Sequence, residues 1–157
     1  MEKYQTQESV PVLLKEASIS DIPVLIELEK SVAGTNIYSP TLDENEWTEE
    51  LQKSKVYLIE KNSAAIGNIS YERKGDDHVY ISGLAVNPVF QGQGVAREAL
   101  MKVLEELKGV KRIDLVTHPD NRVALQIYQS LGFVVESRKE NFYGDGEPRM
   151  VLVLVRT

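Results

Sequence analysis

The chain has 157 residues, 42% of them hydrophobic, and this suits a single domain over residues 1–157 with a real core. Its formal net charge is −6 and its pI is about 5.0, so nucleic-acid binding through a basic face is disfavoured and a cationic or amine-bearing partner fits better. It contains no cysteine, which excludes disulfides, thiolate metal sites and a cysteine nucleophile.

The N-terminal stretch MEKYQTQESVP has no apolar run of the kind found in signal peptides, and residues 1–10 are expected to be a frayed lead-in. The longest apolar run, MVLVLV from Met150 to Val155, is far too short to span a bilayer and predicts a buried strand. We therefore expect a cytoplasmic protein with no membrane contact.

The first half of the chain predicts one strand, two helices and three more strands. The strand VPVLLKEA precedes a helix over residues 18–34, for which Ser20 is the expected cap. A shorter helix is expected to begin near residues 42–43, with Trp47 packing it down. The three strands are predicted at residues 55–60, 64–72 and 78–86, and the first two form a hairpin.

The second half predicts a helix from Gly94 to about Leu107, a strand, a helix capped by Asp120 and stopped by Gly132, and a closing pair of strands. The last two strands flank the turn YGDGE. Hairpins mixed with strand–helix–strand segments predict an α+β or α/β domain with a mixed sheet.

The stretch VFQGQGVAREAL places two glycines at the start of a predicted helix. The first N–H groups of a helix have no internal partner, and glycines let the backbone approach a phosphate closely. The loop is thus a candidate pyrophosphate site, although a glycine turn that simply starts a helix has the same pattern. It lacks the Gly-Lys-Ser/Thr ending of an ATP-binding P-loop. Arg97 stands where the dinucleotide fingerprint of NAD sites needs a small residue.

The segment GLAVNPVFQGQGVAREAL resembles the acetyl-CoA-binding segment of the GNAT superfamily of N-acetyltransferases. The family pattern is a strand ending in Leu-x-Val-x-Pro, then Arg/Gln-x-x-Gly-x-Gly/Ala, then a helix. A second block, NRVALQIYQSLGF, resembles the family's Asn-x-x-Ala-x-x-x-Tyr followed by Leu-Gly-Phe. The resemblance extends from about Val12 to Val155. It implies a mixed, mostly antiparallel central sheet of about seven strands flanked by about four helices, with acetyl-CoA as co-substrate and no metal.

The resemblance also implies where acetyl-CoA lies. The strand at residues 78–86 parts from its neighbour after a bulge that Gly83 permits, and its exposed backbone meets the pantetheine arm and the acetyl group. The pyrophosphate lies on the glycine loop, and the Asn121 side chain lies beside the cofactor. The expected cofactor-binding residues are Leu84, Ala85, Val86, Gln91, Gly92, Gln93, Gly94, Val95, Ala96, Asn121 and Tyr128.

Tyr128 is the expected catalytic residue. Its phenol, with a reference pKa of about 10, is protonated at neutral pH and can donate to the leaving thiolate. Periodicity alone favours a core tyrosine on an amphipathic helix, and it is the matching Asn121 and Leu131-Gly132-Phe133 that favour the catalytic role. Because no cysteine can carry the acetyl group and no Ser-His-Asp arrangement is visible, the amine is expected to attack the thioester directly.

The stretch KENFYGDGEPRMVLVL resembles the C-terminal block of the peptide Nα-acetyltransferase branch, which includes the ribosomal-protein alanine acetyltransferases. On this reading Tyr143 lines the acceptor site, although it also reads as a tyrosine packed on the sheet. That branch often carries Glu or His where Val116 stands here. His118 either reaches the cleft, as a substrate-binding residue, or bonds the Asp120 turn.

The acceptor is accordingly expected to be a peptide N-terminus or an amine-bearing small molecule. An α-amine, with a pKa near 8, needs a dedicated base less than a lysine does. The acidic residues Asp43, Glu44 and Glu46 either attract a cationic acceptor or form a solvated helix face.

Two other functions remain open from the sequence. A non-catalytic acyl-CoA sensor would keep the glycine loop without needing Tyr128, and a nucleotide-phosphate domain would use the same loop for ATP or NAD. A homodimer is common in the resembling family, but the sequence locates no interface.

Overall fold

Residues 10–156 are described by the computed structural model, so the expected lead-in lies almost entirely outside the described residues. Within them, seven strands form one sheet in the order β1-β2-β3-β4-β5-β7-β6. Every neighbouring pair is antiparallel except β4 and β5, which are parallel. The strands are β1 (Leu13–Glu16), β2 (Lys55–Lys61), β3 (Ala64–Gly75), β4 (His78–Val86), β5 (Arg112–Thr117), β6 (Val134–Lys139) and β7 (Arg149–Val155).

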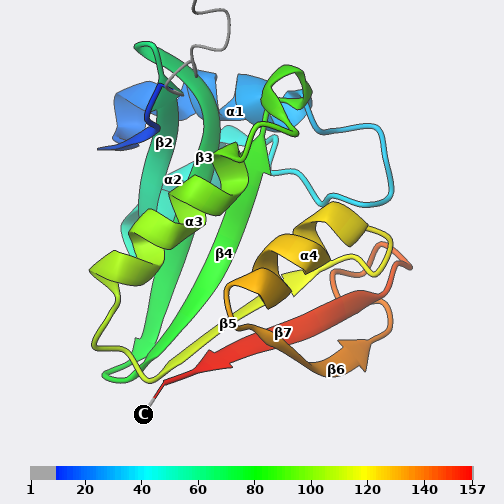
Figure 1. Cartoon of the computed structure of the whole chain (residues 1–157). Helices are drawn as coiled ribbons and strands as arrows, with labels where there is room; N and C mark the ends of the chain where they lie inside the picture. The colour runs from blue at the N-terminus through cyan, green and yellow to red at the C-terminus, as the bar shows by residue number, and fades with distance from the viewer. Residues whose placement is uncertain (1–9, 157) are drawn as a thin grey trace, which may run out of the picture.

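In the described part of the chain, four α-helices cover the two faces of the sheet, as Figure 1 shows. They are α1 (Ile22–Lys30), α2 (Glu44–Lys53), α3 (Val95–Glu106) and α4 (Arg122–Ser130). In Figure 1, α3 and α4 lie in front of the sheet, while α1 and α2 lie behind β2 and β3. The main core lies under α3 and α4, and Trp47, as expected, packs α2 into a second, smaller core with α1. The predicted order of elements and the fold class are confirmed.

The start of α1 differs from the expectation. A short 3-10 turn, Ile19–Asp21, precedes the helix, and it is Ser18 rather than Ser20 that begins the turn. The Asp21 carboxylate reaches back to accept the Ser18 backbone N–H at 2.9 Å, while the Ser20 hydroxyl only contacts that of Ser18. The helix also ends at Lys30, earlier than predicted.

The cap of α4 was also predicted at the wrong residue. Asn121, not Asp120, is the N-cap, because its side-chain oxygen accepts the backbone N–H of Ala124 at 3.3 Å. The Asp120 N–H donates instead to the His118 ring. Asp120 therefore belongs to the turn that precedes α4, and Asn121 caps the helix.

The fold opens between β4 and β5. Their pairing covers only His78–Tyr80 against Arg112–Asp114, and beyond it the two strands run apart (Figure 1). On its other side β4 carries a bulge, because Ile81 pairs with Tyr71 and Gly83 with Ser70, leaving Ser82 as an extra residue. The bulge expected near Gly83 is confirmed.

Candidate active site

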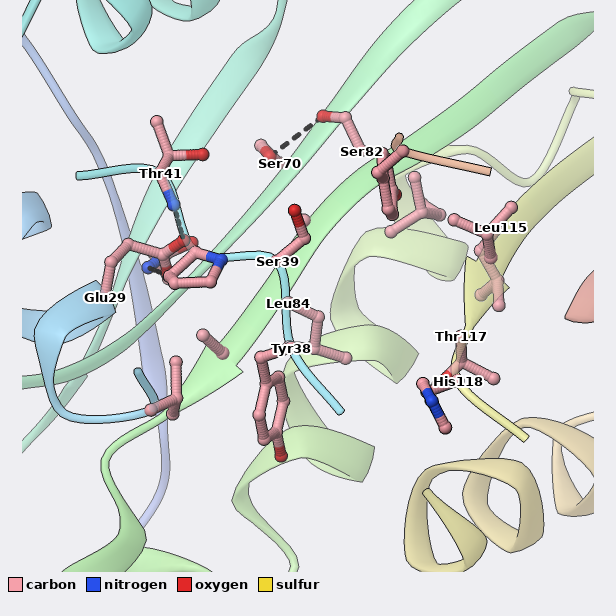
Figure 2. A pocket seen from close by; sticks show the side chains of 18 of the residues that line it. Glu29, Tyr38, Ser39, Thr41, Ser70, Ser82, Leu84, Leu115, Thr117 and His118 are labelled. Carbon is pink, nitrogen blue, oxygen red and sulfur yellow. Dashed lines mark hydrogen bonds between the residues drawn. The ribbon is translucent and has the colours of Figure 1, made fainter. Parts of the chain in front are cut away.

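A cavity of about 160 Å³ lies beside the place where β4 and β5 part. Its walls come from α1, the loop between α1 and α2, α2, β3, β4, the end of β5, α4 and the β6–β7 loop. Figure 2 shows part of this lining, including Glu29, Ser82 and His118. The cavity brings together six of the residues predicted from sequence: Leu84, Ala85, His118, Asn121, Tyr128 and Tyr143. Val86 and the glycine loop do not line it, since they lie further along the chain toward α3.

The glycine loop forms an open cradle at the start of α3. Gly92 and Gly94 have φ angles of +82° and +79°, and a Cβ at either position would meet nothing within 4 Å. Gly94 is the N-cap, has no side-chain cap, and accepts the first intrahelical bond from Glu98. The N–H groups of this first turn thus lack helical partners. The Gln91 side chain donates to the Val86 carbonyl at 2.9 Å, so it ties the loop to β4.

Tyr128 is both a core residue and a wall of the cavity. Its side chain is buried against the main core, with its ring centroid 6.1 Å from that of Phe133. Burial, and to a lesser extent the nearby Tyr38 hydroxyl, raises the pKa of Tyr128. The phenol therefore keeps its proton at neutral pH. Its place in the core is compatible with the catalytic role expected from the sequence.

His118 is buried and both of its ring nitrogens are engaged. Nδ1 accepts the Asp120 backbone N–H at 3.0 Å, so Nε2 carries the proton and donates to Glu147 Oε1 at 2.7 Å. Glu147 Oε1 also accepts from Asn36 at 3.2 Å. The expected bond to the Asp120 turn is therefore present, and the imidazole has no free nitrogen to take a proton.

Tyr143 lies at the edge of the cavity over a buried arginine. The guanidinium of Arg149 lies 5.1 Å from the Tyr143 ring centroid and donates to Asp145 at 3.3 Å and to the Pro148 carbonyl at 3.0 Å. Burial raises the pKa of Tyr143. No sequence signal singles out Arg149, because its burial depends on the fold of the β6–β7 loop.

The acidic residues singled out from sequence do not reach the cavity. Asp43 caps α2 by accepting the Asn45 backbone N–H at 3.0 Å, and Glu44 and Glu46 are exposed. Two other carboxylates, Glu29 and Glu50, line the cavity instead. Sequence signals for them exist: Glu29 interrupts the apolar face of α1, and Glu50 follows the single tryptophan by three residues.

Glu29 fixes the loop that roofs the cavity. One carboxylate oxygen accepts the Thr41 backbone N–H at 3.0 Å (Figure 2). The other accepts the Asn68 amide at 3.2 Å. The Trp47 indole donates to the Thr41 carbonyl at 2.9 Å, so this residue is held on both sides. Burial raises the pKa of Glu29 against the opposing effect of these two hydrogen bonds.

Comparison with known proteins gives the class of this site. Residues 22–133 match the model of the acetyltransferase (GNAT) family, and the chain belongs to that family. Curated relatives include the [ribosomal protein bS18]-alanine N-acetyltransferase of Haemophilus ducreyi, 26% identical over 64% of this chain and 81% of the relative. The enzyme of that name from Escherichia coli strain K12 is 33% identical over 43% of this chain and 47% of the relative. The N-alpha-acetyltransferase 30 of Schizosaccharomyces pombe is 35% identical over 43% of this chain and 46% of the relative.

Solved structures show the same fold. The ribosomal-protein-S18-alanine N-acetyltransferase of Escherichia coli superposes with a TM-score of 0.79 at 22% identity, covering 92% of this chain and 93% of that one. A GNAT family acetyltransferase of Elizabethkingia anophelis with acetyl-CoA bound superposes with a TM-score of 0.74 at 18% identity, covering 92% of this chain and 98% of that one.

The chain is thus an acetyl-CoA-dependent N-acetyltransferase with relatives in the ribosomal-protein Nα-acetyltransferase branch. The comparisons give no support to the non-catalytic acyl-CoA sensor or to the nucleotide-phosphate domain. Across residues 10–156, no helix has the length and apolar character needed to cross a membrane.

Proposed function

We propose that this enzyme acetylates the α-amino group of a peptide, with small primary amines as the alternative acceptors, by direct attack of the amine on acetyl-CoA. One observation carries the proposal: a single cavity is lined by Leu84 and Ala85 of the parted strand, by Tyr128, and by Tyr143. The backbone expected to hold the acetyl group, a proton donor and an acceptor wall thus share one space.

The residues present fit acetyl-CoA. The open cradle at Gly92 and Gly94 suits the pyrophosphate, with backbone N–H groups from Gly92 to Ala96 available to it, while the Gln91 N–H donates to the Pro88 carbonyl at 3.2 Å. On its β5 side, the backbone of β4 from Leu84 to Val86 has no strand partner and can meet the pantetheine arm and the acetyl carbonyl. Asn121 caps α4 with its oxygen and has amide protons left for the cofactor. When bound, acetyl-CoA supplies the activated acetyl group.

The Tyr128 hydroxyl is proposed as the general acid. Its raised pKa keeps the phenol protonated, and its place on the cavity wall lets it give that proton to the departing sulfur. The amine nitrogen bonds to the acetyl carbon, and the bond from that carbon to sulfur breaks. No covalent acetyl-enzyme is needed.

The choice of a peptide α-amine is supported by the curated relatives, several of which are named for acetylation of an alanine in a ribosomal protein. Tyr143 and His118 are the proposed substrate-binding residues. Tyr143 presents a partly exposed ring at the cavity edge, and His118 fixes the β6–β7 loop through Glu147.

The test is steady-state acetylation of paired peptides followed by mass spectrometry. Each pair has one sequence with an internal lysine, once with a free and once with a blocked α-amine, and spermidine and small monoamines complete the panel. We expect acetylation at the N-terminal nitrogen of free peptides only. Acetylation of the lysine in both members of a pair, or of none of the peptides, would contradict a peptide α-amine acceptor.

A further inference from the structure

The bulge in β4 inserts one extra residue into the strand, and that residue is a serine. Ser82, the extra residue of the bulge, donates its hydroxyl proton to Glu50 Oε2 at 2.7 Å. Its oxygen also lies 2.9 Å from the Ser70 hydroxyl (Figure 2). Because the single Ser82 proton goes to Glu50, Ser70 must be the donor to Ser82. All three side chains line the cavity.

This chain of hydrogen bonds has open positions at both ends. A serine oxygen has two lone pairs, so Ser82 can accept from Ser70 and still accept one N–H from a bound ammonium. Among residues 10–156 no hydrogen bond engages the second oxygen of Glu50, and the ammonium of the largely exposed Lys53 lies 3.9 Å from it. The Ser82 proton already points at Glu50 Oε2, so Glu50 can receive it along the existing hydrogen bond and then donate back to Ser82.

Ser82 is also close to the reacting atoms along the chain. Leu84, whose backbone is proposed to meet the acetyl group, follows it by two residues, a span of roughly 7 Å along a strand. An amine placed to attack an acetyl carbon at Leu84 thus comes within reach of the Ser82 hydroxyl.

The other side chains on the cavity wall that could accept a proton are already hydrogen-bonded. Both nitrogens of His118 are hydrogen-bonded, and both oxygens of Glu29 hold backbone or amide N–H groups. Val116 on β5 cannot accept a proton. Glu50 is the carboxylate on this wall with an oxygen that no hydrogen bond in residues 10–156 engages.

We infer that Glu50, acting through Ser82, takes the proton that the acceptor ammonium must lose before it attacks; the inference rests on the amine acceptor proposed above. An ammonium N–H proton passes to Ser82 Oγ as the Ser82 proton passes to Glu50. The neutral nitrogen then bonds to the acetyl carbon, and the electron pair of the broken carbon–sulfur bond goes to sulfur, which takes the Tyr128 proton. A second nitrogen proton restores Tyr128 through solvent, Glu50 releases its own to solvent, and one proton is released overall.

Three variants test this role: Glu50→Gln, Ser82→Ala and, as the matched control, Glu49→Gln, which removes the same charge from an exposed position on α2. For each, kcat and KM with a free-α-amine peptide are measured from pH 6 to pH 10, together with acetyl-CoA affinity by calorimetry. We expect Glu50→Gln to lower kcat/KM about 100-fold near pH 6.5 and Ser82→Ala about 10-fold. Acetyl-CoA affinity and the Glu49→Gln profile should match the wild type.

The pH dependence separates proton transfer from a structural effect. Above about pH 8 an α-amine is already largely neutral, so the Glu50→Gln deficit should shrink to within a few-fold by pH 9.5. A Glu50→Gln deficit in kcat/KM that is equal at every pH, or no deficit at all, would overturn the inference. The proposed function would still stand in that case if the wild type acetylates the peptide. If the wild type acetylates neither peptide α-amines nor small amines, the proposed acceptor and this inference are both overturned.

Discussion

His118 Nε2 and Glu147 Oε1 are joined by a 2.7 Å hydrogen bond that links the end of β5 to the β6–β7 loop. The same Glu147 oxygen accepts from Asn36, so the loop between α1 and α2 is tied to this point as well. Three segments distant in sequence thus meet at the Glu147 carboxylate, beside a histidine that lines the cavity. We therefore propose that His118 holds the proposed acceptor site in shape.

Replacing His118 by alanine should accordingly raise KM for the acceptor about 10-fold and change kcat little, because the β6–β7 loop loses its tie while the proton donor stays in place. The kcat/KM profile should show no ionisation near pH 6.5 that the variant removes. His78→Ala is the control, since His78 pairs with Asp114 at 3.0 Å and does not line the cavity. A group titrating near pH 6.5 in the wild type and absent from His118→Ala would show that the histidine is a base.

Tyr128→Phe removes only the hydroxyl and keeps the ring in the core against Phe133. We expect kcat to fall about 100-fold with acetyl-CoA affinity unchanged, as for loss of a general acid. Since the pKa of Tyr128 is raised, the wild type should show no alkaline loss of activity from this phenol up to about pH 10. Steady-state kinetics and calorimetry check both points, and a phenylalanine variant as fast as the wild type would remove Tyr128 from the mechanism.

Gly94→Trp should abolish acetyl-CoA binding, because the new side chain would stand in the open space beside the first N–H groups of α3. Calorimetry should show at least a 100-fold loss of affinity. Gly94→Asn is the control, since asparagine tolerates the positive φ of this position without filling the cradle. Undiminished binding by Gly94→Trp would place the pyrophosphate elsewhere.

Much of this architecture follows from local sequence. The apolar spacing before Leu107, the turn residues at 61–64 and the glycine loop each specify their element, and Gly83 correctly indicated a bulge in β4. The two wrong helix caps lie where neighbouring polar residues compete for one role. Ser18 and Ser20 are two residues apart, and the Asp21 carboxylate decides between them by reaching back to the Ser18 N–H.

The sequence places Glu50 on the same helix face as Trp47, but it does not predict the contact between Glu50 and Ser82. Glu50 meets Ser82 across 32 residues, and the contact requires both the packing of α2 on the sheet and the one-residue shift of the bulge. Glu29 likewise meets Asn68 only because α1 lies on β3 and β4. The sequence predicts the bond between His118 and the Asp120 turn, but it does not predict the bond between His118 and Glu147.

The far end of α3 provides a test of what holds this helix on the sheet. Glu106 accepts hydrogen bonds from the hydroxyls of Tyr57 on β2, at 2.5 Å, and Tyr71 on β3. Bonds to a charged acceptor contribute about 1.5–3 kcal/mol each, and Glu106→Ala leaves two partly buried hydroxyls without it. We expect the free energy of unfolding at pH 7 to fall by about 2–4 kcal/mol. Glu105→Ala, a change at an exposed neighbour, should leave it within about 0.5 kcal/mol.

The pH dependence gives this prediction a second readout. Burial first, and then the Glu106 carboxylate, raises the pKa of Tyr71 to about 12 and that of Tyr57 as well. A folded-state pKa above the unfolded value of about 10 means that the stabilisation is complete below pH 10 and is lost as pH rises toward 12. Urea unfolding followed by circular dichroism should therefore show wild-type stability falling more steeply above pH 10 than that of Glu106→Ala. Parallel curves for the two proteins would mean that Glu106 does not hold the tyrosine hydroxyls.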